Sequence, residues 1–201
     1  MQLIFYTTVS PEEYYCRQGK DFPFPELDYC PHCRLKVSPQ KHGFFDRNAI
    51  AANFSSRILI RRYYCPYCHT TISYLPSFCL PYFQYTVDLI FTGIRLVLEF
   101  NFSLRGYLKF LKERCRQLYW DISHLQFYLR RFLTRLSAIK LGLRQFLPRV
   151  QLPEEKLAKR EGAQKVLRLM ATGFAHIQIF SARFYEAYGY SFMAPLHNIL
   201  A

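Results

Sequence analysis

The cysteines at positions 30, 33, 65 and 68 are the residues whose types and spacing most clearly indicate chemistry. They form two C-x-x-C motifs, CPHC at 30–33 and CPYC at 65–68, with 31 residues between them. Each motif supplies two thiolates from one tight turn, and Zn²⁺ binds four thiolates in a tetrahedron at about 2.3 Å. Proline at the second position of both motifs fixes φ in the turn. We therefore predict that Cys30, Cys33, Cys65 and Cys68 hold one structural Zn²⁺ ion.

Other chemistry remains open for these thiols. A redox pair normally occurs once, near a βαβ pattern that this sequence does not show. Two disulfides suit a secreted chain, but the N-terminus lacks the pattern of a signal peptide. A histidine at 32, 42 or 69 is an alternative fourth ligand. The remaining cysteines (Cys16, Cys79 and Cys115) have no spaced partner, so we expect buried free thiols there.

Four thiolates close a zinc site and leave no position for a reactive water. We therefore expect no enzymatic activity. A catalytic zinc, with one of the four cysteines not serving as a ligand, is the alternative.

The charge of the chain is strongly localised. Of the net +13, residues 101–150 contribute +9, from 11 basic and 2 acidic side chains. A local basic excess on helices predicts a polyanionic partner. A solvated helical face, or a face directed at an anionic membrane, is the alternative. Seven cysteines, an odd number, favour a reducing compartment, and we expect a cytoplasmic, nucleoid-associated protein.

Short strands must position the two cysteine motifs. Apolar and β-branched runs predict strands at 3–9, 42–47, 57–64 and 70–74. This predicts a small zinc ribbon of a few antiparallel strands within residues 1–80. So small a sheet cannot bury enough surface alone, so the metal is expected to contribute to folding. Residues 76–84 form a connector bounded by prolines.

Helices are predicted for most of the remaining chain. Residues 85–100 are apolar on nearly all sides but include three charges in 16 residues, which favours a core helix over a membrane span. Amphipathic helices follow at 103–118 and 123–136, with Ser103 and Ser123 as expected caps. Further helices are predicted at 138–147 and 154–172. The aromatic segment 173–201 either packs on the core or forms a partner surface.

The predicted fold class is therefore α+β, in three regions. These are the zinc ribbon (1–80), a helix-turn-helix-like DNA-binding region (81–147) and a C-terminal helical and aromatic docking region (154–201). The basic third helix suits a helix-turn-helix arrangement, and a plain helical hairpin is the alternative. The expected phosphate contacts are Arg105, Lys109, Arg130, Arg131 and Arg135, and the expected base contacts are His124, Gln126 and Phe127.

The motifs resemble a known group of proteins. The carrying residues are CPHC at 30–33, HGF at 42–44, Arg47, IRRYYCPYC at 60–68, Thr71, Ser73, LPSF at 75–78 and Pro81-Tyr82. Together they resemble the N-terminal zinc ribbon of bacterial insertion-sequence transposases, and small zinc-ribbon proteins found with mobile elements, in which a helix-turn-helix follows. The resemblance covers about residues 30–136.

This resemblance implies DNA binding with the four cysteines as zinc ligands. It does not imply catalysis, because only four acidic residues follow Leu136 and no aspartate follows Asp121. We expect a zinc-stabilised, sequence-directed protein that binds double-stranded DNA and serves a mobile element or associated system without a nuclease domain. The alternative is a non-catalytic interaction subunit that docks on a larger recombinase, nuclease or RNA-guided effector and grips the nucleic acid of that enzyme. A transposase, a recombinase or effector protein, and a second copy of the chain are the candidate protein partners. No membrane partner is expected.

Overall fold

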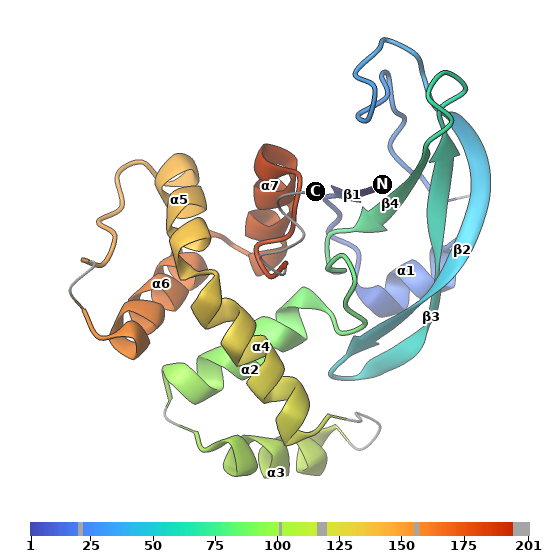
Figure 1. The fold of residues 1–201 in the computed structure, drawn as a ribbon. Coiled ribbons are helices and arrows are strands. Elements are labelled where there is room, and N and C mark those ends of the chain that lie inside the picture. The colour runs from blue at the N-terminus through green and yellow to red at the C-terminus, as the bar shows by residue number, and fades with distance from the viewer. Residues whose placement is uncertain (20–21, 101, 116–119, 155–156, 195–201) are drawn as a thin grey trace.

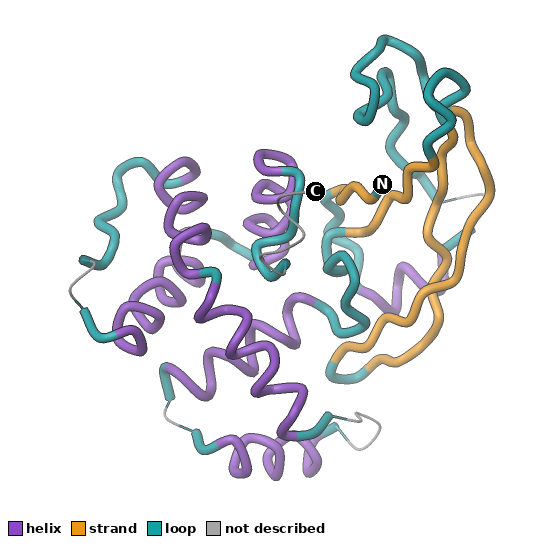
Figure 2. The backbone as a smooth tube through the Cα atoms, viewed as in Figure 1, coloured by secondary structure: helices purple, strands orange, loops and turns teal. Residues whose placement is uncertain are grey.

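A twisted sheet and a group of helices lie side by side in this α+β fold (Figure 1). The computed structural model describes residues 1–19, 22–100, 102–115, 120–154 and 157–194. The strands belong to the N-terminal part of the chain, and most of the helices follow them (Figure 2). Within the described residues, no helix has the length and apolar character needed to cross a membrane.

The sheet contains β1 (Gln2–Phe5), β2 (Gln40–Ala51), β3 (Phe54–Tyr64) and β4 (Thr71–Pro76), in the order β1-β4-β3-β2. Neighbours β2, β3 and β4 are antiparallel, whereas β1 runs parallel to β4. The expectation of an antiparallel sheet is therefore wrong for β1, and the sheet is mixed. Parallel strands need a long connection, and the chain between β1 and β4 supplies it.

The β2–β3 hairpin is longer than the sequence predicted. A turn at residues 52–53 joins the strands, and their pairing continues to Gln40 opposite Tyr64. The register shifts between Lys41 and Phe44, where Gly43 has φ of +73°. Glycine adopts this left-handed conformation without steric cost, so the β2–β3 hairpin can bend at Gly43.

A short helix, α1 (Pro11–Arg17), was not predicted. The Ser10 hydroxyl caps it by accepting a hydrogen bond from the Glu13 amide at 3.1 Å. Tyr14 of α1 is fully buried, and its hydroxyl donates to the Leu59 carbonyl at 2.7 Å. Aromatic side chains of the N-terminal arm complete this core beside β3 and β4.

The six remaining helices are α2 (Val87–Leu98), α3 (Leu104–Arg114), α4 (Ile122–Thr134), α5 (Leu136–Phe146), α6 (Lys159–Gly173) and α7 (Ile177–Tyr188). Ser103 caps α3 as predicted. The prediction that Ser123 caps α4 is wrong: Asp121 is the N-cap, and the Ser123 hydroxyl donates to its carboxylate at 2.6 Å. The predicted helical residues 116–118 and 155–156 lie outside the described residues. So do residues 195–201, the end of the predicted aromatic segment 173–201.

One hydrophobic core joins these helices, with α2 against α3, α4, α6 and α7. Phe180 and Phe184 of α7 are fully buried in it, so the described aromatic residues of the C-terminal segment pack on the core. The regions predicted as separate units at 81–147 and 154–201 therefore share one core. Gly93 lets α2 approach closely, because a Cβ there would lie 3.2 Å from side-chain atoms of Leu125 and Tyr107.

The connector 76–84 and α7 attach the helices to the sheet. Phe78 belongs to the sheet core and Leu80 to the helical core. Gln178 of α7 accepts a hydrogen bond from the Ser77 hydroxyl at 3.0 Å and donates to the Asp88 carboxylate at 2.7 Å. Burial raises the pKa of Asp88 above its ordinary value, although the Gln178 hydrogen bond opposes this.

Candidate metal centre and nucleic-acid interface

The structure brings the four predicted cysteines together. The Sγ atoms of Cys30, Cys33, Cys65 and Cys68 all lie within 4.8 Å of one another, and no cysteine among the described residues is in a disulfide. The Cys30 and Cys68 sulfurs are 3.7 Å apart, and those of Cys33 and Cys65 are 4.0 Å apart. Tetrahedral coordination at about 2.3 Å would place sulfurs about 3.8 Å apart. The spacing therefore fits a metal ion held by four thiolates.

We call the two cysteine turns knuckle 1 (30–34) and knuckle 2 (65–69). They share one backbone hydrogen bond and one left-handed residue. The amide of the fifth residue donates to the carbonyl of the first, Arg34 to Cys30 at 2.8 Å and His69 to Cys65 at 3.0 Å. Both fifth residues are left-handed, with φ of +60° and +56°. This conformation is costly for residues with a Cβ, so tertiary structure must hold it.

Hydrogen bonds around the sulfurs favour thiolates unequally. The Thr70 side chain, followed by its backbone, lowers the pKa of Cys68 to about 5, with smaller contributions from Cys65 and His32. The pKa of Cys33 is raised to about 11, because the Leu35 backbone lowers it less than desolvation and the neighbouring thiols together raise it. Four neighbouring thiolates repel one another, which disfavours ionisation of all four. A divalent cation bound between them offsets this repulsion.

The two buried cysteines of the cluster attach it to the sheet. Cys30 and Cys65 are fully buried and pack with Tyr63 and Ile72. The Tyr63 hydroxyl donates to the Pro25 carbonyl at 2.8 Å and ties the N-terminal arm to this core. Strand β3 leads directly into knuckle 2, and β4 leaves it, so sheet pairing fixes the position of one half of the site.

The other cysteines and the described histidines do not belong to the group of side chains that could hold a metal ion. Of the described residues, only the four predicted cysteines form a group that could hold a metal ion. The histidine alternatives are not supported by this geometry. Cys79 is buried as expected, but Cys115 is only partly buried and Cys16 is exposed on α1, so the expectation for those two is wrong.

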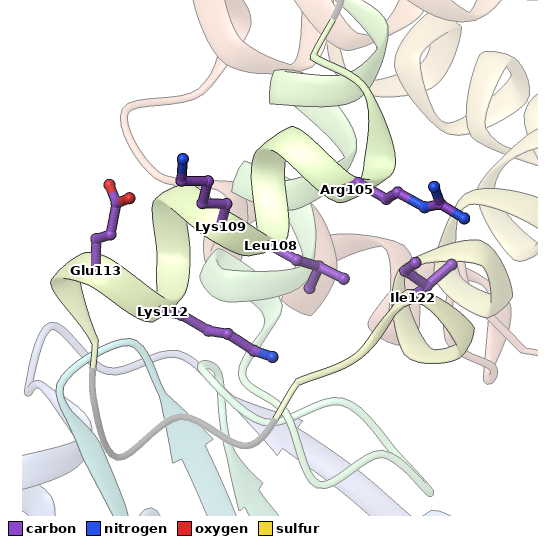
Figure 3. Close-up of a pocket in the computed structure, with 6 residues that line it drawn as sticks. All are labelled: Arg105, Leu108, Lys109, Lys112, Glu113 and Ile122. Carbon is purple, nitrogen blue, oxygen red and sulfur yellow. The ribbon is translucent and has the colours of Figure 1, made fainter.

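Basic residues line two hollows on the helical part of the chain. Arg105, Leu108, Lys109 and Lys112 of α3 line a hollow with Ile122 of α4. Figure 3 shows Arg105, Leu108 and Lys112 projecting toward the side of α3 on which Ile122 lies. We call the residues of this hollow, together with those of a second hollow described next, the α3–α4 face.

The α3–α4 face continues toward α6. Gln126 and Arg130 lie four and eight residues after Ile122, on the same side of α4. They line a second hollow with Leu129, Leu133 and Lys159. The residues that line the two hollows include five cations and one acidic residue, Glu113. Lys112, which the sequence also places on the basic side of helix 103–118, and Lys159 were not among the predicted nucleic-acid contacts. Lys159 reaches this surface because α6 packs beside α4.

The predicted nucleic-acid residues divide between different surroundings. Arg105, Lys109, Gln126 and Arg130 are exposed on the α3–α4 face. The remaining candidates are His124, Phe127, Arg131 and Arg135, and none of these four lines either hollow.

His124, Phe127 and Arg131 lie toward the connector side of α4. The His124 ring accepts from the Asp121 amide in the capping box of α4. Phe127 packs against Phe83, with ring centroids 6.0 Å apart. The Arg131 guanidinium lies 5.0 Å from the centre of the Phe127 ring.

The expectation that Arg135 faces outward is wrong. Its side chain is only 4% exposed, and its guanidinium lies 5.0 Å from the centre of the Tyr190 ring. Arg135 is also the joint between α4 and α5, where its amide bonds back to the carbonyls of Arg131 and Phe132. A buried guanidinium cannot contact a phosphate without rearrangement of α7 and its C-terminal loop.

Comparison with known proteins gives one match. Residues 30–100 are similar to a protein family described as a domain of unknown function (DUF6431). This span covers both knuckles, β2 to β4 and α2, and ends before α3. No curated protein and no solved structure matches the chain. The similarity therefore includes the metal centre but not the α3–α4 face.

Proposed function

We propose that this chain is a zinc-stabilised protein that binds double-stranded DNA through the α3–α4 face, in a sequence-directed manner and without nuclease activity. The observation that carries the proposal is that five cations from three helices line two surface hollows, Arg105, Lys109 and Lys112 in the first and Arg130 and Lys159 in the second. Phosphate contacts of this kind supply most of the affinity of DNA-binding proteins. Gln126, exposed beside Arg130, is the best placed candidate for base recognition.

Zinc is the metal that best suits the cysteine cluster. Four soft thiolates at tetrahedral spacing favour Zn²⁺ over the harder divalent cations. When bound, Zn²⁺ would supply fixed tetrahedral coordination and no open position for a substrate. Its role in the proposal is to hold the knuckles and the sheet. The resemblance to transposase zinc ribbons is a further reason to choose DNA as the polyanion and a mobile element as the setting.

The salt dependence of duplex binding tests the proposal. If the five cations each neutralise a phosphate, log K falls with log[salt] with a slope of about −4.5, or about 500-fold between 50 and 200 mM. Replacing Lys109, Lys112 and Arg130 with alanine should bring the slope to about −1.8.

The matched control replaces Arg144, Arg149 and Arg183, three exposed cations outside the face, with alanine. This control removes the same charge and should leave the slope nearly unchanged. Equal slopes for the two triple variants would refute the α3–α4 face as the binding surface. Selection from random duplexes would then test whether Gln126→Ala alters the preferred site.

An interaction subunit is a second candidate function, favoured by one observation. A groove of about 1290 Å³ lies between β1, residues 25–31 and α7, and tyrosines contribute to its lining. Concave sites lined by apolar and aromatic side chains are where ligands usually bind, and an interaction subunit would bind a partner's side chains there. If duplex binding is weak or indifferent to the triple variant, docking on a larger nucleic-acid enzyme becomes the better proposal.

A further inference from the structure

Three rings form a row where the β2–β3 hairpin meets knuckle 2. The ring centroids of His42 and Tyr64 are 5.5 Å apart, and those of Tyr64 and His69 are 6.0 Å apart. The Tyr64 hydroxyl is 2.5 Å from Nδ1 of His69. Both histidines are exposed and Tyr64 is half-buried. The row is therefore held in place by the sheet while its rings face solvent.

Another exposed ring and one cation accompany this row. Tyr67, two residues before His69 in knuckle 2, is 65% exposed. Arg62 lies on the same side of β3 as Tyr64, because side chains two apart in a strand share a face. Arg62 forms no ion pair with a described acidic residue. Lys41 pairs with Tyr63, so it lies on the opposite face of the sheet. We call His42, Arg62, Tyr64, Tyr67 and His69 the ring surface.

The composition of the ring surface suits an anion with flat, apolar groups. Residues 29–45 and 57–87, which contain this surface, have no aspartate or glutamate. Tyr67 contributes nothing to the knuckle core, whose buried members are Cys30, Tyr63, Cys65 and Ile72. Packing therefore does not account for a tyrosine at this tip.

We propose that the ring surface binds single-stranded nucleic acid. Bases would stack on Tyr67 and on the exposed rings of the row, and Arg62 would contact a phosphate. Exposed aromatic rings beside cations are the usual means of holding unpaired bases, since every base has a face that can stack. A duplex keeps its bases stacked on one another, so it does not offer this contact.

This inference goes beyond duplex binding by the α3–α4 face and stands on different residues. The alternative for Arg62 alone is electrostatic: four thiolates around a divalent ion carry a net charge of −2, which Arg62 would partly offset. That alternative requires no exposed Tyr67 ring, so substitutions of the ring distinguish the two.

Fluorescence anisotropy with labelled (dT)₁₂ and a labelled blunt duplex tests the proposal on the full, zinc-loaded chain. Tyr67→Ala should weaken (dT)₁₂ binding by about 5- to 150-fold, from about 1–3 kcal/mol for one stacked base. Tyr67→Trp should retain it. The matched control is Tyr82→Ala, because Tyr82 is also a loop tyrosine and is 77% exposed; it should have no effect. Duplex binding should change little in all three variants.

The outcomes separate the two proposals. Selective loss of (dT)₁₂ binding in Tyr67→Ala, with unchanged circular dichroism and zinc content, would support the ring surface. Equal effects of Tyr67→Ala and Tyr82→Ala would overturn it. Loss of (dT)₁₂ binding only in the Lys109/Lys112/Arg130 triple variant would also overturn it, because single strands would then use the α3–α4 face. Failure of duplex binding alone would leave the ring surface supported and refute the function proposed for α3 and α4.

Discussion

Removal of the proposed Zn²⁺ ion should unfold the knuckles and the adjoining ends of β3 and β4 while the helical core remains folded. The knuckle core consists of Tyr63 and Ile72 packed with two of the cysteines. The helical core contains no residue of either knuckle. A chelator therefore removes the main stabilising contact of the first without touching the second.

The size of the effect follows from the loop that the metal closes. Thirty-one residues lie between Cys33 and Cys65. Treated as a cross-link in the unfolded chain, closure of such a loop contributes about 4 kcal/mol. Because whole domains are stable by only about 5–15 kcal/mol, this loss is enough to open the knuckles locally. The loss of metal–thiolate bonding adds to it.

Hydrogen exchange measures this directly. The amides of Cys30 and Cys65 donate to the Leu35 and Thr70 carbonyls inside the knuckles. A loss of about 4 kcal/mol should speed their exchange about a thousandfold, whereas the amides of α2 should change little. Reloading with Zn²⁺ should restore protection. If confirmed metal removal left knuckle exchange unchanged, the reasoning that the metal holds this region together would be refuted.

Three further outcomes test the packing. Gly93→Ala should destabilise the fold by about 1–3 kcal/mol, because the new methyl meets neighbouring side chains at 3.2 Å, whereas Gly162→Ala, with nothing within 4 Å, should be neutral or stabilising in denaturant titrations. Arg34→Gly should raise the unfolding free energy by about 1 kcal/mol by relieving its left-handed strain, and an unchanged midpoint would count against that strain. The pKa of Asp88 is raised in the folded protein. The protonated carboxyl therefore stabilises the folded state fully when the pH is below the pKa of the unfolded chain, and this stabilisation is lost as the pH rises through the folded pKa. Asp88→Asn should therefore stabilise the protein at pH 7 relative to wild type and lose that advantage below pH 4, and an equal difference at both pH values would contradict this.

Local sequence signals were sufficient for the cysteine cluster and for most helices. The paired C-x-x-C motifs predicted the four cysteines that lie close enough to hold a metal ion, because each motif forms its turn from its own residues. Ser103 was identified as a cap for the same local reason. The short α1 carried an equally local signal, Ser10 followed by Pro11 and Glu13, which was overlooked.

Features that depend on distant parts of the chain were not predicted. The parallel pairing of β1 with β4 joins residues about 70 positions apart, and nothing in β1 itself states its direction. The α3–α4 face includes Lys159 of α6, which reaches this surface only because α6 packs beside α4. Periodicity places residues on a face of one helix but does not say which neighbour covers that face.

Helix α4 illustrates how one choice of periodicity decides a functional assignment. A leucine pattern through Leu129 and Leu133 places Arg135 outside, but the buried residues are Leu125, Tyr128 and Phe132. Continued by three residues, that buried face includes Arg135, which is where the structure places it. The two leucines instead lie half-exposed beside Arg130. When Tyr128 is counted as a core residue, the helix is rotated so that Arg135, a predicted phosphate contact, is buried. The same rotation leaves Gln126 and Arg130 exposed. The DNA-binding proposal therefore rests, in α4, on Gln126 and Arg130 and not on Arg135.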